Sequence, residues 1–231
     1  MILIKNNIMC MFVINMFNMP FSLPQKILTE FIGTFFLSIT ICKAAIHGSV
    51  DAYVPFAIAA TLMAVIYSGG HISGAHYNPA VTISIYIRGA CNKNEVLPYV
   101  ISQVLAAVSA ALVVEKFLIN DNFHNVELFL LNSEAIVAEL LFTFLLAYVI
   151  LNVATTESKS SNWYYGAAIS LVVLAGVITV GDISLASFNP AVTSALIISG
   201  KISISASWMH FLPQFAGAIL AAYTYKFTLE N

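Results

Sequence analysis

The stretch Asn78-Pro79-Ala80-Val81-Thr82 returns in the second half of the chain as Asn189-Pro190-Ala191-Val192-Thr193. A glutamine keeps the same distance from each copy: Gln103 follows Asn78 by 25 positions, and Gln214 follows Asn189 by 25. A third landmark repeats upstream, where Glu30-Phe31-Ile32-Gly33-Thr34-Phe35 resembles Glu139-Leu140-Leu141-Phe142-Thr143-Phe144. Three landmarks in matching order predict a chain built from two similar halves.

The composition indicates that the chain is dissolved in lipid. Hydrophobic residues make up 60% of the 231 residues, charged residues only 9%, and the mean hydropathy is +0.89. A soluble domain carries about 25% charged residues. The net charge of -2 gives no electrostatic basis for nucleic-acid binding. Three scattered cysteines, Cys10, Cys42 and Cys91, form no Cys-x-x-Cys pair and indicate neither a disulfide framework nor a metal site.

Six segments are apolar and long enough to approach the roughly 20 residues that a membrane-crossing helix needs. They are residues 25–47, 54–70, 97–117, 134–152, 164–180 and 208–226. Two further apolar segments, 77–89 and 188–200, each hold only 13 residues and are predicted to be re-entrant half-helices. Because each half has an odd number of spans, the second half enters the membrane upside down. The fold class is therefore an all-α membrane protein with an inverted repeat.

Lysine and arginine predict the orientation. With both termini in the cytoplasm, six of these residues lie on the cytoplasmic side and three outside. The channel domain is assigned to residues 25–226, with repeats at about 25–117 and 134–226 and a C-terminal tail at 227–231. Residues 1–24, with their apolar run at 8–21, are interpreted as a cytoplasmic tail rather than a signal peptide. The plasma membrane and an internal membrane both remain open.

Each Asn-Pro-Ala box is suited to begin a helix abruptly. Asparagine is a favoured N-cap residue and proline suits the first helical position. Inversion brings the two helix starts face to face, each carrying about half a positive charge, and this potential opposes cations and protons. A water held by both asparagine amides cannot relay a proton between its neighbours. The alternative is that each asparagine only caps its helix, but two boxes at repeat positions favour a pore.

These motifs together resemble the major intrinsic protein family, the aquaporins and aquaglyceroporins. Residues 71–82, His-Ile-Ser-Gly-Ala-His-Tyr-Asn-Pro-Ala-Val-Thr, are similar to that family's first pore loop, and the glutamate motifs and both boxes also fit. The resemblance covers about residues 25–226. It implies a right-handed bundle of six transmembrane helices plus two re-entrant half-helices. It also implies a homotetramer in the lipid bilayer in which every subunit has its own pore.

Three ionisable residues are assigned to support of the pore loops. The resemblance implies that Glu30 and Glu139 each accept hydrogen bonds from backbone donors of a loop. A proton relay would need a chain of partners, and none is visible around these carboxylates. His76 is interpreted as a hydrogen-bonded loop residue, with a pH-sensing position beside the lumen as the alternative. Gln103 and Gln214 are interpreted as polar helix contacts.

The sequence departs from the family at the selectivity filter. The family's second box is normally followed by arginine, where this chain has Val192. Alignment with the family's other filter positions predicts a filter of Ile58, Val177, Ala186 and Val192, without charge, histidine or aromatic ring. This set matches neither the water-selective nor the glycerol-selective pattern of the family.

The predicted function is a passive channel for water and small uncharged solutes. The first alternative is a facilitator chiefly for glycerol, urea or ammonia with low water flux. The second is a membrane-junction protein that keeps the fold but conducts poorly. An enzyme is not predicted, because paired carboxylates, a nucleophile with its base and a metal cluster are all missing from the sequence pattern. No cofactor and no ion-coupled transport are expected.

Overall fold

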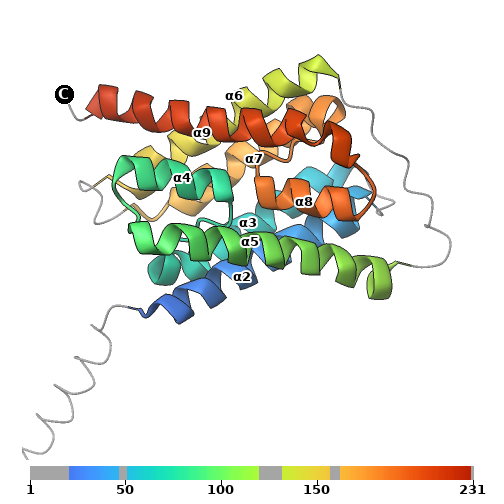
Figure 1. Cartoon of the computed structure of the whole chain (residues 1–231), viewed down its shortest axis with the longest axis horizontal. Coiled ribbons are helices and arrows are strands. Elements are labelled where there is room, and N and C mark those ends of the chain that lie inside the picture. Colours follow the sequence, from blue (N-terminus) through green and yellow to red (C-terminus); the bar gives the residue numbers. More distant parts are fainter. Residues whose placement is uncertain (1–20, 47–50, 120–131, 157–161, 230–231) are drawn as a thin grey trace, which may run out of the picture.

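The computed structural model describes residues 21–46, 51–119, 132–156 and 162–229, and these residues contain helices and no strands (Figure 1). The long helices are α2 (Leu23–Thr40), α3 (Val54–Ser73), α5 (Lys93–Val113), α6 (Ser133–Ala154), α7 (Tyr165–Ser184) and α9 (Trp208–Leu229). The short ones are α4 (Pro79–Arg88) and α8 (Pro190–Ile198). Widened helical turns, η1 (Ile41–Ile46) and η3 (Val114–Leu118), extend α2 and α5, and tighter turns, η2 (Asp51–Tyr53) and η5 (Ile204–Ala206), precede α3 and α9. The predicted all-helical architecture is confirmed. The interpreted tail at 1–24 falls almost wholly outside the described residues.

Five of the described helices are long and apolar enough to cross a membrane. They are Leu23–Ala45, Val54–Ser73, Lys93–Leu118, Ser133–Ala154 and Tyr165–Ser184. The sixth long helix, α9, has 22 residues but is not among these five, and it carries polar residues such as Gln214 and Lys226. Gln214 is fully buried against the rest of the bundle. The half-helices α4 and α8 have only 10 and 9 residues, too few to cross.

The helix packing is the same in both halves. In the first half α2 packs against α3 and α5, and in the second half α6 packs against α7 and α9. The half-helices pack crosswise, because α4 contacts α9 of the other half and α8 contacts α5. Figure 1 shows α4 and α8 lying in line between α5 and α9. The two halves therefore interlock around the half-helices.

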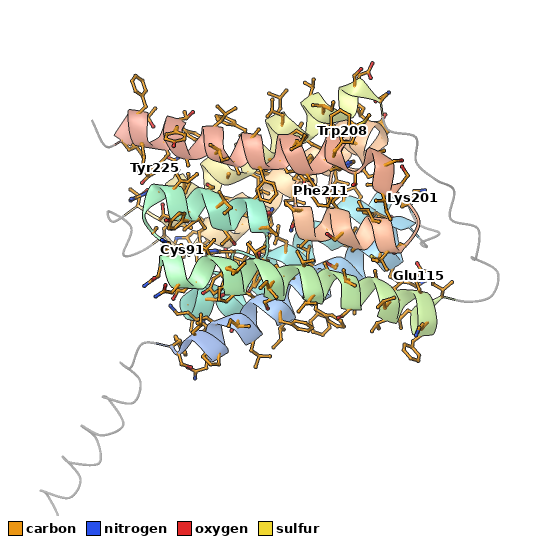
Figure 2. The ribbon with its side chains drawn as sticks, in the orientation of Figure 1. Cys91, Glu115, Lys201, Trp208, Phe211 and Tyr225 are labelled. Atoms are coloured by element: carbon orange, nitrogen blue, oxygen red, sulfur yellow. The ribbon has the colours of Figure 1, made fainter. Side chains whose placement is uncertain are left out.

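The bundle has two distinct ends. Figure 2 shows Cys91 and Tyr225 at one end and Lys201 and Glu115 at the other; we call these the Cys91 end and the Lys201 end. Helix α2 begins and helix α9 ends at the Cys91 end (Figure 1). The start of the first described long helix and the end of the last one therefore lie at the same end of the bundle.

Glycine permits close approach at the contact of α6 and α9. A Cβ atom at Gly217 of α9 would lie 2.5 Å from the backbone oxygen of Leu140 and 2.9 Å from the backbone nitrogen of Phe144 in α6. Backbone atoms cannot yield as a flexible side chain can. The absence of a side chain at this position therefore brings the two helices into contact, close to Gln214 and Glu139.

Candidate functional site: a two-sided lumen

The two boxes hold each other at the centre of the bundle. The side-chain amide nitrogen of Asn78 donates to the carbonyl of Phe188 at 2.8 Å, and that of Asn189 donates to the carbonyl of Tyr77 at 2.9 Å. Each carbonyl belongs to the residue directly before the other asparagine. The repeat thus places the two helix starts in a reciprocal, hydrogen-bonded contact.

Each asparagine also caps its own half-helix. The Oδ1 of Asn78 accepts from the backbone nitrogen of Ala80 at 2.8 Å, and the Oδ1 of Asn189 accepts from that of Ala191 at 2.9 Å. Pro79 and Pro190 occupy the first helical position of each half-helix. A proline is suited to this position because its missing N–H would have no partner there. Capping and pore lining are therefore compatible roles for one side chain.

The arrangement directs positive potential and donors into one place. The N-termini of α4 and α8 each carry the positive end of a helix dipole. One amide N–H of each asparagine is taken by the opposite carbonyl, and an amide nitrogen has a second N–H to offer. Asn78 and Asn189 are buried, but both line the same cavity. A small molecule there meets donors and positive potential, which disfavour a cation.

Glu30 fixes the loop before the first box. One carboxylate oxygen accepts from the hydroxyl of Ser73 at 2.6 Å and from the backbone nitrogen of His76 at 2.9 Å. The other accepts from the backbone nitrogen of Tyr77 at 2.7 Å and from the side-chain nitrogen of Gln103 at 2.8 Å. Glu30 is fully buried, so these four donors offset the loss of water around its carboxylate.

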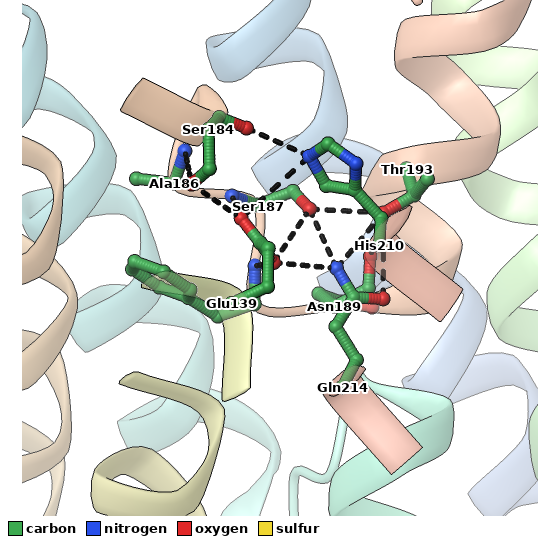
Figure 3. Close-up of polar contacts among 9 residues, drawn as sticks. Glu139, Ser184, Ala186, Ser187, Asn189, Thr193, His210 and Gln214 are labelled. Atoms are coloured by element: carbon green, nitrogen blue, oxygen red, sulfur yellow. Dashed lines mark hydrogen bonds and ion pairs between the residues drawn. The ribbon is translucent and has the colours of Figure 1, made fainter. Parts of the chain in front are cut away.

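Glu139 does the same for the second loop (Figure 3). One oxygen accepts from the hydroxyl of Ser184 at 2.7 Å and from the backbone nitrogen of Ser187 at 3.0 Å. The other accepts from the backbone nitrogen of Phe188 at 2.8 Å, from Gln214 at 2.7 Å and from the Ser187 hydroxyl at 3.3 Å. The donors come from three elements: α7, the loop before α8, and α9.

Sequence reasoning missed several members of these networks. Ser73 and Ser184 are 111 positions apart, as are the two box asparagines, and each donates to the glutamate of its own half. The same offset relates Tyr99, whose hydroxyl donates to the carbonyl of Ser73 at 2.9 Å, to His210, whose Nε2 lies 2.7 Å from the carbonyl of Ser184. Applying the box offset to every polar residue of the first half would have found the serines.

Two cavities are lined by residues of the boxes or of the loops before them, and the larger of the two extends from the boxes to the Lys201 end. Its volume is about 630 Å³. The predicted filter residues Ile58, Val177, Ala186 and Val192 all line it, as do Asn78 and Asn189. Ile58 comes from α3, Val177 from α7, Ala186 from the loop before α8, and Val192 from the first turn of α8. The structure therefore places Ile58 of the first half on the same cavity as three residues of the second half.

The loop before α8 reaches the cavity through unusual backbone conformations. Leu185 and Ala186 have φ angles of 63° and 46°. Non-glycine residues adopt this left-handed region at a cost of about 1–2 kcal/mol each. In the first half the position matching Leu185 is Gly74, with φ 88°. The second loop thus holds a bulky residue at a strained position where it lines the larger cavity.

A smaller cavity of about 300 Å³ lies toward the Cys91 end. The loop residues Gly74, Ala75 and His76 line it. The Nδ1 of His76 lies 3.2 Å from the hydroxyl of Thr82, so this histidine is hydrogen-bonded and borders the lumen as well. Ile150 and Ile169 line both cavities. They mark where the two halves of the lumen meet. In the described ranges no cluster of three His, Cys, Asp or Glu side chains could hold a metal ion.

Two half-helices whose N-termini meet inside a bundle of long apolar helices, with a cavity on either side, define a membrane channel. The comparisons with known proteins agree. A model of the family described as Major intrinsic protein matches residues 16–175 and 158–231. The chain belongs to the major intrinsic protein family. It is therefore a channel for water and small neutral solutes, not an enzyme.

Several plant proteins are similar to the chain. Aquaporin NIP1-4 of Oryza sativa subsp. japonica is 33% identical over 216 residues, which cover 90% of this chain and 78% of that protein. Aquaporin NIP1-2 of Arabidopsis thaliana is 34% identical over 219 residues, covering 87% and 73%. Nodulin-26 of Glycine max is 30% identical over 211 residues, covering 87% and 77%.

A solved structure shares the fold. The X-ray structure of the aquaglyceroporin from Plasmodium falciparum superposes with a TM-score of 0.74 and covers 90% of this chain and 97% of that one. The sequence identity is 20%, so this likeness concerns the arrangement of the helices.

Proposed function

We propose that the chain is a weakly size-selective facilitator for water and small neutral solutes, with Ile58, Val177, Ala186 and Val192 as its filter. The observation that carries this proposal is the larger cavity, which reaches both boxes and is lined by all four side chains. These four side chains offer no charge and no hydrogen-bonding group. A filter of this kind distinguishes solutes by size and by the loss of hydration rather than by specific contacts.

Exclusion of ions is assigned to the boxes. An ion in an apolar filter loses hydration without receiving replacement ligands, which costs several kcal/mol or more. At the boxes a cation also meets two positive helix ends and the asparagine donors. The reciprocal bonds of Asn78 and Asn189 keep both dipoles directed at one point. Neutral molecules lose less hydration free energy in the filter than ions do, and the positive potential at the boxes repels them much less.

A second candidate is a facilitator mainly for glycerol, urea or ammonia with low water flux. The observation that favours it is the apolar side chains that make up most of the larger cavity's wall, such as Leu37, Leu62 and Val173. Water passing such a wall loses hydrogen bonds that the wall does not replace. Glycerol gains apolar contact there through its carbon chain, so its passage relative to water rises.

Osmotic swelling of proteoliposomes tests the proposal. Vesicles containing the purified chain are exposed to osmotic gradients that drive the flux of water, glycerol or urea, with empty vesicles as the control. We expect all three to pass faster than through the empty vesicles. Glycerol and urea flux with little added water flux would favour the second candidate. The absence of any added flux would favour the poorly conducting junction protein and contradict the proposed function.

Assembly and orientation are part of the same proposal. We infer a homotetramer from the family, and apolar side chains such as Leu105, Leu141 and Leu212 are exposed on the outer surface for contact with lipid or a second subunit. We assign the Cys91 end to the cytoplasm, because Lys26, Arg88, Lys93 and Lys226 belong to helix ends on that side. Chemical cross-linking in membranes and protease access to a tag at residue 231 test the two assignments.

A further inference from the structure

The wall of the larger cavity carries very little charge. Among its described lining residues only Asp182 and Lys201 are formally charged. Lys201 is half-buried, whereas Asp182 is exposed. Asp182 belongs to the last turn of α7, and Lys201 follows the C-terminus of α8. Two opposite charges thus border one end of an otherwise nearly uncharged lumen.

Lys201 lies at the end of a row of α8 residues that face the lumen. Val192 and Leu196, four positions apart and therefore on one helix face, both line the larger cavity. The backbone nitrogen of Lys201 donates to the carbonyl of Leu196 at 2.9 Å, which turns the chain back over this row. Figure 2 shows Lys201 at the end of the bundle opposite Cys91 and Tyr225. The row therefore leads along the cavity wall from the second box to Lys201.

The position of this charge matters because the cavity walls are apolar. A low-dielectric wall focuses the field of a fixed charge along a water-filled passage. A cation entering from the Lys201 end therefore experiences repulsion before it reaches the boxes, while a neutral solute does not. Asp182 has the opposite sign and weakens this field. Because salt screens charges at an exposed opening within about 8–10 Å, the effect depends on ionic strength.

We propose that Lys201 is a specificity-determining residue that repels cations at its end of the lumen, and that Asp182 attenuates the repulsion. The inference rests on the proposed function, because it requires a conducting lumen. Lys201 also lies near the negative end of the α8 dipole, where a lysine stabilises the helix. That structural role predicts a change in stability when the charge is removed, but no change in ion selectivity of the folded channel.

The first experiment compares Lys201→Gln, Asp182→Asn and Lys116→Gln in proteoliposomes. Lys116 is an exposed lysine at the same end that does not line the cavity, so it is the matched control. We expect a severalfold increase in potassium and proton leak for Lys201→Gln, a decrease for Asp182→Asn, and wild-type leak for Lys116→Gln. The increase for Lys201→Gln should shrink at high salt. Glycerol and water fluxes should stay at wild type in Lys116→Gln, and in the two lumen variants they should change less than the cation leak does.

The second experiment varies the sign of the charge on one protein preparation. Lys201→Cys is treated with a thiol reagent bearing a quaternary ammonium or with one bearing a sulfonate, and wild-type protein is treated in parallel. The ammonium reagent should reduce cation leak and the sulfonate reagent should increase it. Two outcomes would overturn the role of Lys201 and leave the proposed function intact. One is an equal effect of both reagents; the other is an unchanged leak in Lys201→Gln while the wild type conducts neutral solutes. A wild type that passes no neutral solute would overturn the proposed function as well.

Discussion

Asn78 donates its side-chain amide to the carbonyl of Phe188 at 2.8 Å, so the first box is completed by a residue from the opposite half of the chain. Asn189 makes the matching bond to Tyr77. Asn78→Asp or Asn189→Asp replaces this donor by a carboxylate that faces a carbonyl oxygen and cancels the positive potential of the helix ends. We expect either loss of folded protein or cation leakage, measured by surface abundance and by ion flux in vesicles.

The control for this prediction is Asn92→Asp. Asn92 caps α5 and accepts from the backbone nitrogen of Asn94 at 3.0 Å, a function that an aspartate also performs. Wild-type permeability and wild-type ion exclusion in both box variants would contradict the central role of Asn78 and Asn189.

Val192→Arg tests the filter. Arginine adds a fixed positive charge and a fork of donors, and it fills space that valine leaves open. Passage of glycerol and urea should fall most, water should fall less because it can bond the guanidinium, and any proton leak should decrease. Water, glycerol, urea and proton fluxes are measured side by side at equal protein amounts. A uniform change in all four would place the constriction elsewhere, for example beside Tyr77 or Phe188.

Ala186→Cys tests whether the loop before α8 lines the conducting path. The wild-type channel is expected to resist mercury from the Lys201 end, and the variant is expected to become sensitive, because the thiol would lie in the larger cavity. Serine is nearly the same size as cysteine but has no thiol. Ala186→Ser is therefore the control for the change in side-chain size. Unchanged conduction in an Ala186→Cys channel that mercury has labelled would show that this side chain is not in the path.

Glu139→Gln tests the support of the second loop. A glutamine offers one oxygen where the carboxylate offers two, and its NH₂ group would face the donors of Phe188 and Gln214. Leaving buried donors unpaired costs about 1–3 kcal/mol. We therefore expect a lower thermal unfolding temperature in detergent and reduced flux. The exposed Glu134→Gln, in the first turn of α6, should change neither; equal stability of the two variants would contradict this assignment.

Cys91 gives a prediction on pH. Burial, followed by the negative charge of Glu95, raises the pKa of its thiol to about 11. Because the thiolate is the reactive form, alkylation of Cys91 should be slow at neutral pH and should rise about tenfold per pH unit up to the pKa. The rate is measured by mass spectrometry on a variant with Cys10→Ser and Cys42→Ser. Adding Glu95→Gln should lower the pKa and speed the reaction at pH 8; a rate that is flat above pH 8.5 would contradict the shift.

The sequence predicted the architecture because the features that determine the fold occur twice, at matching spacings in the two halves. The repeated boxes, the matching glutamines and the two short apolar segments each follow from spacing alone. The reciprocal bonds between Asn78 and Phe188, and between Asn189 and Tyr77, could not be predicted in the same way. They depend on how far each half-helix reaches into the bundle, which is set by packing of α4 against α9 and of α8 against α5.

Other parts of the site escaped prediction because the two halves solve one problem with different residues. Tyr99 and His210 occupy matching positions and both contact a serine carbonyl, but a phenol and an imidazole share no sequence pattern. Leu185 adopts a left-handed backbone where the first half has Gly74, although leucine does not signal such a turn. Lys201 reaches the cavity because the chain folds back after α8, and this fold-back is not visible in the hydrophobic pattern.

The division of contacts at the boxes has a consequence for biosynthesis. Every donor to Glu30 comes from residues 73–103, so the first loop can be braced as soon as the first half has left the ribosome. The amide of Asn78 has to wait for the carbonyl of Phe188, which is made 110 residues later. The centre of the pore therefore closes only after most of the second half has been made. A nascent first half in the bilayer is a braced but open structure, and it cannot form a sealed pathway before its second half arrives.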